Sequence, residues 1–107
     1  MASTPEGKIK GKLDKMLKEE GVWFYSPQSG IYGRSGIPDR VAIVSGRFVG
    51  IECKARYELK PTDLQMKTML EITNAGGRCF VAYDTESIEI IRAYIQAVRT
   101  REGLTLS

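Results

Sequence analysis

The chain has 107 residues, a length that fits a single domain spanning residues 1–107. Its formal net charge is +3 and its isoelectric point is near 8.9. It contains no histidine, and this excludes histidine-dependent zinc sites and catalysis by Ser–His or Cys–His pairs. Any catalysis must therefore depend on carboxylates and lysine.

The pattern of the sequence predicts neither a targeting segment nor a membrane-spanning segment. No apolar run approaches the roughly 20 residues that cross a bilayer, and the stretch from Met1 to Lys12 is polar. We therefore expect a protein of the cytoplasm, in a bacterial or phage-infected cell, with no membrane partner. Cys53 and Cys79 lie in apolar runs without metal-ligand spacing, so free buried thiols in a reducing compartment are expected.

The first predicted element is a helix of about fifteen residues. Ser3 is its expected cap, with Pro5 in the first turn and Glu6 in capping-box register. An apolar stripe follows at helical spacing, made of Ile9, Leu13, Met16 and Leu17, and Gly21 ends the helix. Five lysines, at positions 8, 10, 12, 15 and 18, fall mostly on other faces and predict an ordinary solvated surface, with a phosphate-binding face as the alternative.

The next predicted elements are strands. Residues 22–25 form a short β-branched and aromatic run, and residues 26–36 form a long flexible connection. Two apolar runs, residues 40–44 and 47–53, flank Ser45-Gly46, which predicts a β-hairpin with a two-residue turn.

A second helix is predicted from Pro61-Thr62-Asp63-Leu64-Gln65 to Asn74, ended by Gly76-Gly77. Residues 78–83 predict a strand buried on both faces, and a last helix is marked by Ile88, Ile91, Ile95 and Val98. Residues 99–107 show no clear pattern. The expected order is αβββαβα around one mixed sheet.

The hairpin register brings charged residues together. If the chain reverses symmetrically about Ser45-Gly46, Asp39 faces Glu52, with Cβ atoms about 4.5–5.5 Å apart. Lys54 lies on the same face as Glu52, about 6.6 Å further along the strand. Two opposed carboxylates repel unless a cation lies between them. We therefore expect these three side chains to converge on one spot.

A simpler alternative is an ion pair between Glu52 and Lys54 at a strand end, with Asp39 as a turn residue. Charges in an otherwise apolar strand are costly unless they are paired or bound to metal, which favours a metal site. Oxygen ligands suit Mg²⁺, with Mn²⁺ able to substitute. Such an ion supports phosphodiester hydrolysis, and Lys54 would orient the attacking water.

These residues resemble a known signature. Pro38-Asp39 followed by Glu52-Cys53-Lys54 is similar to the P-D…(D/E)-x-K pattern of the restriction-endonuclease-like superfamily. With Gly36-Ile37, Gly46 and Thr62-x-x-Gln65, the chain from about Glu6 to Asp84 resembles the virus-type replication-repair nuclease (VRR-Nuc) domain. The resemblance implies an α/β fold, with a restriction-endonuclease-like αβββαβ core, a mixed central sheet and a C-terminal helix.

The resemblance also implies roles. The implied metal ligands are Asp39, Glu52, the main-chain carbonyl of Cys53 and Glu6, and the implied catalytic residues are Asp39, Glu52, Lys54 and Gln65. Glu6 matches a glutamate on the family's first helix, although the capping box with Ser3 explains it as well. Gln65 matches a helical glutamine beside the site, but Thr62-x-x-Gln65 is also a capping box.

Two segments flank the expected site and predict contacts with the DNA backbone: Tyr32, Arg34 and Ser35 before it, and Arg56 and Lys60 after it. The resemblance implies a metal-dependent endonuclease that is selective for branched DNA such as four-way junctions. Because a two-fold symmetric junction needs two active sites, we expect a homodimer. The alternatives are a non-specific nicking or end-processing nuclease, and a catalytically inactive DNA-binding or assembly protein with the same fold.

Overall fold

The computed structural model describes residues 4–28 and 34–106, with the backbone alone for residues 102–106. Its elements are α1 (Pro5–Glu19), β1 (Trp23–Tyr25), β2 (Arg40–Val44), β3 (Arg47–Cys53), α2 (Asp63–Asn74), β4 (Arg78–Ala82) and α3 (Thr85–Leu106). This order, with one mixed sheet, is the order that the sequence predicts. Over the described residues, no helix combines the length and apolar character needed to cross a membrane.

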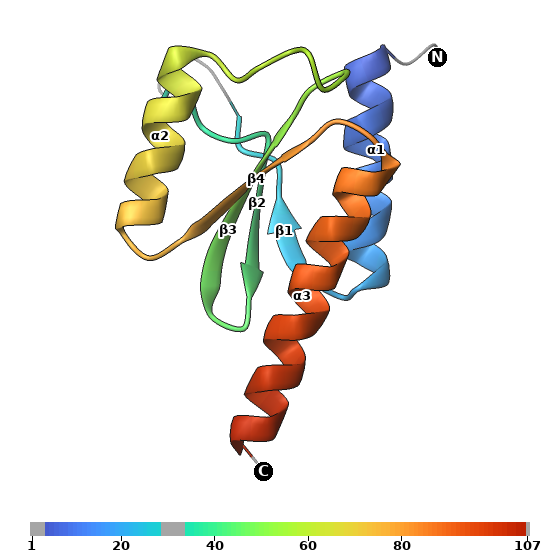
Figure 1. The fold of residues 1–107 in the computed structure, drawn as a ribbon, viewed down its shortest axis with the longest axis vertical. Coiled ribbons are helices and arrows are strands. Elements are labelled where there is room, and N and C mark those ends of the chain that lie inside the picture. Colours follow the sequence, from blue (N-terminus) through green and yellow to red (C-terminus); the bar gives the residue numbers. More distant parts are fainter. Residues whose placement is uncertain (1–3, 29–33, 107) are drawn as a thin grey trace.

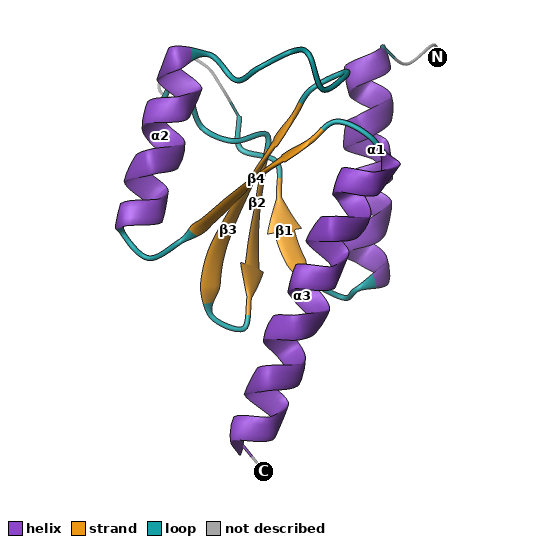
Figure 2. Ribbon diagram, viewed as in Figure 1, coloured by secondary structure: helices purple, strands orange, loops and turns teal. Residues whose placement is uncertain are grey.

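The four strands form one sheet in the order β1-β2-β3-β4. The pairs β1–β2 and β2–β3 are antiparallel, whereas β3 and β4 are parallel. Helices α1 and α3 cover one face of the sheet and α2 lies on the other (Figures 1 and 2). All three helices begin at the end of the sheet where β2 starts and β3 finishes (Figure 1).

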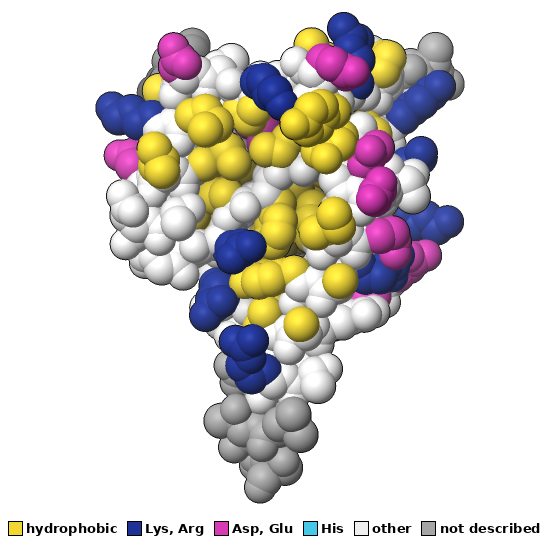
Figure 3. Space-filling view, in the orientation of Figure 1, with side chains coloured by type: hydrophobic (Ala, Val, Ile, Leu, Met, Phe, Trp, Pro, Cys, Tyr) yellow, Lys and Arg dark blue, Asp and Glu magenta, His cyan; other side chains and the backbone are white. Residues whose placement is uncertain are grey.

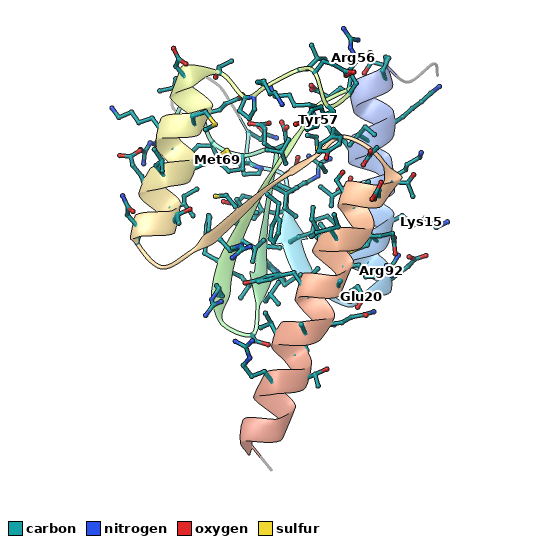
Figure 4. All side chains as sticks on the ribbon, in the orientation of Figure 1. Lys15, Glu20, Arg56, Tyr57, Met69 and Arg92 are labelled. Atoms are coloured by element: carbon teal, nitrogen blue, oxygen red, sulfur yellow. The ribbon has the colours of Figure 1, made fainter. Side chains whose placement is uncertain are left out.

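The hydrophobic core lies between the sheet and the pair α1–α3. Its buried members are Ile9, Leu13, Met16, Leu17, Val22, Ala42, Val44, Val49, Ile51, Cys53, Ala82, Ile88, Ile91 and Ile95. Arg92 of α3 ties the two helices together, with Nη1 2.8 Å from Glu20 Oε2 and Nη2 2.9 Å from Glu19 Oε1 (Figure 4). Because side chains alternate along a strand, Glu52 and Lys54 point to the opposite face, toward α2.

The hairpin has the predicted bounds and register. Arg40 pairs with Ile51 and Val44 pairs with Arg47, so continuing the ladder by one residue places Asp39 opposite Glu52. The turn residues Ser45 and Gly46 have φ values of 49° and 81°. Positive φ at both positions is the geometry of the tight turns that match strand twist.

The start of α1 differs from the prediction. Thr4 is the N-cap, and its Oγ1 accepts a hydrogen bond of 3.0 Å from the Gly7 N–H. The residue before a proline is biased to extended backbone, as Thr4 is, and this sets the cap directly before Pro5. Glu6 therefore lies one position too early for a capping box, and Ser3 lies outside the described residues.

Two later elements also differ. β4 is an edge strand rather than one buried on both faces: Arg78 is exposed, Cys79, Phe80 and Val81 are half-buried, and Ala82 alone is buried. The helix α3 continues through residues 99–106, where the sequence shows no pattern. Figure 1 shows this end of α3 extending past the sheet, so it has no sheet face to cover and needs no apolar stripe there.

Candidate active site

Asp39 and Glu52 form a pair of interacting carboxyl groups at the end of the hairpin. Glu52 is only 2% exposed, and its Oε2 is buried without a hydrogen-bond partner among the described residues. Burial, then a hydrogen bond with Asp39 and its negative charge, raise the pKa of Glu52 to about 8. The two carboxyl groups therefore resist being charged together, and it is the charged form of Glu52 that is disfavoured.

Asp39 is the charged member of the pair. Burial opposes its charged form, but hydrogen bonds from Glu52 and the Cys53 N–H, with the nearby charges of Lys10 and Arg40, outweigh burial and lower its pKa. The Cys53 N–H donates to Asp39 Oδ2 at 2.8 Å. This bond fixes the carboxylate against the end of β3.

Arg40 holds the backbone at Asp39 in place. Its Nε and Nη2 donate to the two carboxylate oxygens of Asp14 on α1, at 2.6 and 3.0 Å. Its Nη1 donates to Ser26 Oγ at 2.6 Å and to the main-chain carbonyl of Asp39 at 2.8 Å. The sequence prediction missed this residue. Its position directly after Asp39, on the alternate face of the strand that meets α1, is the signal that could have identified it.

Lys54 contacts α2 through Gln65. Lys54 Nζ donates to Gln65 Oε1 at 3.1 Å, and the same oxygen accepts from the Thr62 N–H at 2.8 Å. Thr62 Oγ1 in turn accepts from the Gln65 N–H at 3.2 Å, which completes a capping box. The two interpretations of Gln65 are therefore compatible, because one oxygen both caps the helix and contacts the lysine.

Glu6 reaches the carboxyl pair through Lys10. Lys10 Nζ lies 3.4 Å from Glu6 Oε2 and 3.6 Å from Asp39 Oδ1. Burial lowers the pKa of Lys10, but the charge of Asp39 and the contact with Glu6 outweigh it and raise the pKa. In the described part of the chain, no three side chains of His, Cys, Asp or Glu are grouped to hold a metal ion.

Lys10 therefore departs from the prediction of a fully solvated lysine face. The spacing of Glu6 and Lys10, four residues apart on one helix, indicates their pairing. The further contact with Asp39 could not be predicted, because it depends on how α1 packs against the end of the sheet.

Cys53 contributes its backbone to this end of the sheet. Its side chain is buried in the core on the other face, and burial raises the pKa of its thiol to about 12. The thiol of Cys53 therefore does not face the carboxyl pair, and the implied metal contact of its main-chain carbonyl stays a prediction. Both cysteines are free thiols, although Cys79 is half-buried rather than buried.

A cavity of about 260 Å³ opens beside Asp39, between the segment before β2 and the start of α2. It is lined by Pro27, Gln28, Arg34, Gly36, Ile37, Pro38, Asp39, Thr62, Leu64 and Gln65. Gly36 has a φ of 80°, and a Cβ there would lie 2.9 Å from atoms of Leu64 and Thr68. Glycine at this position therefore lets the segment pass close against α2.

Four of the five residues expected to contact DNA lie within the described part of the chain. Arg34 lines the cavity and forms a 2.6 Å ion pair with Glu71, and Ser35 is exposed. Arg56 is exposed with Glu58 4.0 Å away, and Lys60 lies over the ring of Tyr57. Tyr32 lies outside the described residues. Their contacts with DNA remain predictions.

No protein-family model matches the chain, and no curated protein matches it in sequence. The resemblance to the VRR-Nuc domain therefore remains a prediction from the motifs. The arrangement of Asp39, Glu52 and Lys54 at the end of the hairpin is what bears on the function of the chain.

Proposed function

We propose that this chain is a metal-dependent nuclease of the restriction-endonuclease-like superfamily, similar to the VRR-Nuc domain, that hydrolyses phosphodiester bonds in DNA. The observation that carries the proposal is the buried Oε2 of Glu52, which lacks a partner among the described residues and belongs to a carboxyl group opposed to Asp39. Two buried carboxylates that are both charged destabilise the fold unless a cation binds between them. A catalytic role for Asp39 and Glu52 would explain why the chain has this costly pair.

The donors at this site suit a small, oxygen-preferring cation. Glu52 Oε2 is buried and has no hydrogen-bond partner among the described residues, and Asp39 Oδ1 faces the ammonium group of Lys10, a weak contact at 3.6 Å. Together with the main-chain carbonyl of Cys53, these oxygens would hold Mg²⁺ or Mn²⁺. Such an ion supplies Lewis-acid polarisation of the phosphate and stabilises charge that develops on the leaving oxygen.

The other residues of the site position the reacting groups. Lys54, which donates a hydrogen bond to Gln65, would orient the attacking water and offset the negative charge of the phosphate in the transition state. Arg40 keeps the backbone of Asp39 fixed between α1 and the loop after β1. Arg34, Arg56 and Lys60 offer positive charge to the flanking phosphates.

We further propose that the substrate is branched DNA and that the protein is a homodimer, since a two-fold symmetric junction requires two active sites. Trp23, Ile43 and Phe48 form a row across β1, β2 and β3 in register, and each is exposed. A second copy would cover such an apolar row. A monomer by light scattering at the concentration of the assay would contradict the dimer while leaving the nuclease itself untouched.

The test is incubation of labelled linear, flap and four-way DNA with Mg²⁺, Mn²⁺ or EDTA. Wild type should cleave with either metal, whereas Asp39→Ala and Lys54→Ala should be inactive although folded by circular dichroism. Lys8→Ala is the matched control, because Lys8 is an exposed lysine on α1. Cleavage in EDTA, or by Asp39→Ala, would refute the metal mechanism. Metal-dependent DNA binding without cleavage would favour the inactive DNA-binding alternative.

A further inference from the structure

A second cavity lies beside the candidate active site. It measures about 190 Å³ and is lined by Tyr57, Leu59, Lys60, Pro61, Val81 and Tyr83. The rings of Tyr57 and Tyr83 meet edge to face, with centroids 5.2 Å apart and an interplanar angle of 63°. Lys60 Nζ lies 3.7 Å from the centroid of the Tyr57 ring. The walls are thus apolar and aromatic, and one ammonium group lies over a face of the Tyr57 ring.

The register of the sheet places this pocket next to the carboxyl pair. Val81 pairs with Glu52 across the parallel strands β3 and β4, so both side chains point to the same face, with the strands about 4.8 Å apart. The Lys54 N–H donates to the carbonyl of Ala82 at 2.9 Å, which brings Tyr83 level with Lys54. The floor of the pocket is therefore one strand away from Glu52.

Two side chains of the pocket wall are open to solvent. Tyr57 is 61% exposed and Leu59 is 40% exposed. Figure 3 shows hydrophobic side chains gathered between α2 and the start of α3, with Lys and Arg side chains close by, and Figure 4 places Tyr57 at this end of the sheet. If Tyr57 served only to hold the segment between β3 and α2 in place, burying its ring would stabilise the fold more than exposing it does. The exposed aromatic surface points to a ligand.

The chemistry of the pocket selects the ligand. Aromatic faces stack with flat π-systems, and an ammonium group attracts an adjacent negative charge. A nucleotide has both features, a flat base and a phosphate. We propose that the pocket binds an unpaired nucleobase of the DNA, next to the phosphodiester bond at Asp39 and Glu52; this rests on the proposed nuclease function.

This pocket supplies a physical basis for structure selectivity. A base inside a duplex must leave its stack and its partner before it can enter, whereas a base at a bulge, flap or junction is already free. Selection would then depend on unpaired bases near the cleaved bond rather than on the sequence.

The experiment uses the full chain and oligonucleotides that carry 2-aminopurine, a fluorescent adenine analogue, either in a one-base bulge or in a perfect duplex. Binding is measured in EDTA, so that cleavage plays no part. Wild type should bind the bulged DNA about tenfold more tightly than the duplex, the preference expected from one stacked base. The fluorescence of the bulged base should be quenched on binding, because it stacks on tyrosine.

The variants separate a base pocket from a structural clamp. Tyr57→Ala should lose the preference for bulged DNA and the quenching of 2-aminopurine, but keep its affinity for duplex DNA. Tyr57→Phe should keep the preference and the quenching. Leu70→Ala is the control, because Leu70 is equally exposed, at 61%, but lies on α2 away from the pocket. Loss of affinity for both DNAs with an unchanged ratio would overturn the proposal, as would wild-type behaviour in Tyr57→Ala.

The outcomes for the two proposals are distinguishable. A preference for bulged DNA that depends on Tyr57, in a protein that never cleaves with Mg²⁺ or Mn²⁺, supports the pocket and refutes the nuclease. Metal-dependent cleavage with no contribution from Tyr57 to bulge preference refutes the pocket and leaves the nuclease proposal unaffected.

Discussion

The ammonium group of Lys10 stands between two carboxylates that no local pattern brings together: its Nζ lies 3.6 Å from Asp39 Oδ1 and 3.4 Å from Glu6 Oε2. It thereby offsets part of the negative charge at the end of the hairpin. A divalent cation bound to Asp39 and Glu52 would meet this positive charge at short range. We therefore expect Lys10 to oppose the metal binding that we propose for this site.

Replacing Lys10 with glutamine should strengthen metal binding. The expected gain in Mn²⁺ affinity is about tenfold, since a positive charge near a divalent ion is removed. Isothermal titration with Mn²⁺ measures it directly, and Lys8→Gln, an exposed lysine of the same helix, should bind as wild type. Unchanged or weaker binding by Lys10→Gln would contradict this role.

The raised pKa of Glu52 makes the stability of the metal-free protein dependent on pH. A carboxyl group whose pKa rises on folding, here from 4.5 to about 8, destabilises the fold as pH rises through that range. Asp39, whose pKa is lowered from 3.8, titrates below this window. Glu52→Gln removes the effect, so its melting temperature should exceed that of wild type by more at pH 8.5 than at pH 5.

Thermal unfolding in EDTA at the two pH values tests this prediction. Glu58→Gln is the control, because Glu58 is an exposed glutamate whose removal should leave the pH dependence unchanged. A gap between Glu52→Gln and wild type that is the same at both pH values would show that Glu52 ionises normally.

Gln65 and Thr62 share a capping box, which allows the two roles of Gln65 to be separated. Thr62→Ala and Gln65→Ala should each lower the free energy of unfolding by about 1 kcal/mol, the usual contribution of an N-cap. Gln65 alone contacts Lys54, so Gln65→Ala alone should also slow cleavage, by about tenfold or more. Urea unfolding and single-turnover cleavage measure the two effects. Equal cleavage rates in the two variants would restrict Gln65 to capping.

Arg40 should not tolerate replacement by lysine. Lysine keeps the charge but cannot form the paired hydrogen bonds to Asp14 while also reaching Ser26 and the carbonyl of Asp39. We expect a loss of about 1–3 kcal/mol in the free energy of unfolding. We also expect weaker Mn²⁺ binding, because Asp39 loses its support. Arg56→Lys, at an exposed arginine, should change neither quantity.

The sequence predicts the elements that depend on local pattern. Ser45-Gly46 between two apolar runs gives the turn and the register, and that register places Asp39 opposite Glu52. The contacts of Lys10 and Arg40 could not be predicted in this way. Arg40 and Asp14 are 26 residues apart, and their pairing exists only because the fold brings α1 close to the first residue of β2. Long-range packing of this kind leaves no periodic signal in the chain.

The direction of the helices has an electrostatic consequence. Because α1, α2 and α3 all begin at the end of the sheet that carries Asp39 and Glu52, the positive ends of their peptide dipoles face the same side of the molecule (Figure 1). This field favours an approaching polyanion even though the net charge of the chain is only +3. Part of that attraction resides in the main chain, where no side-chain substitution can remove it.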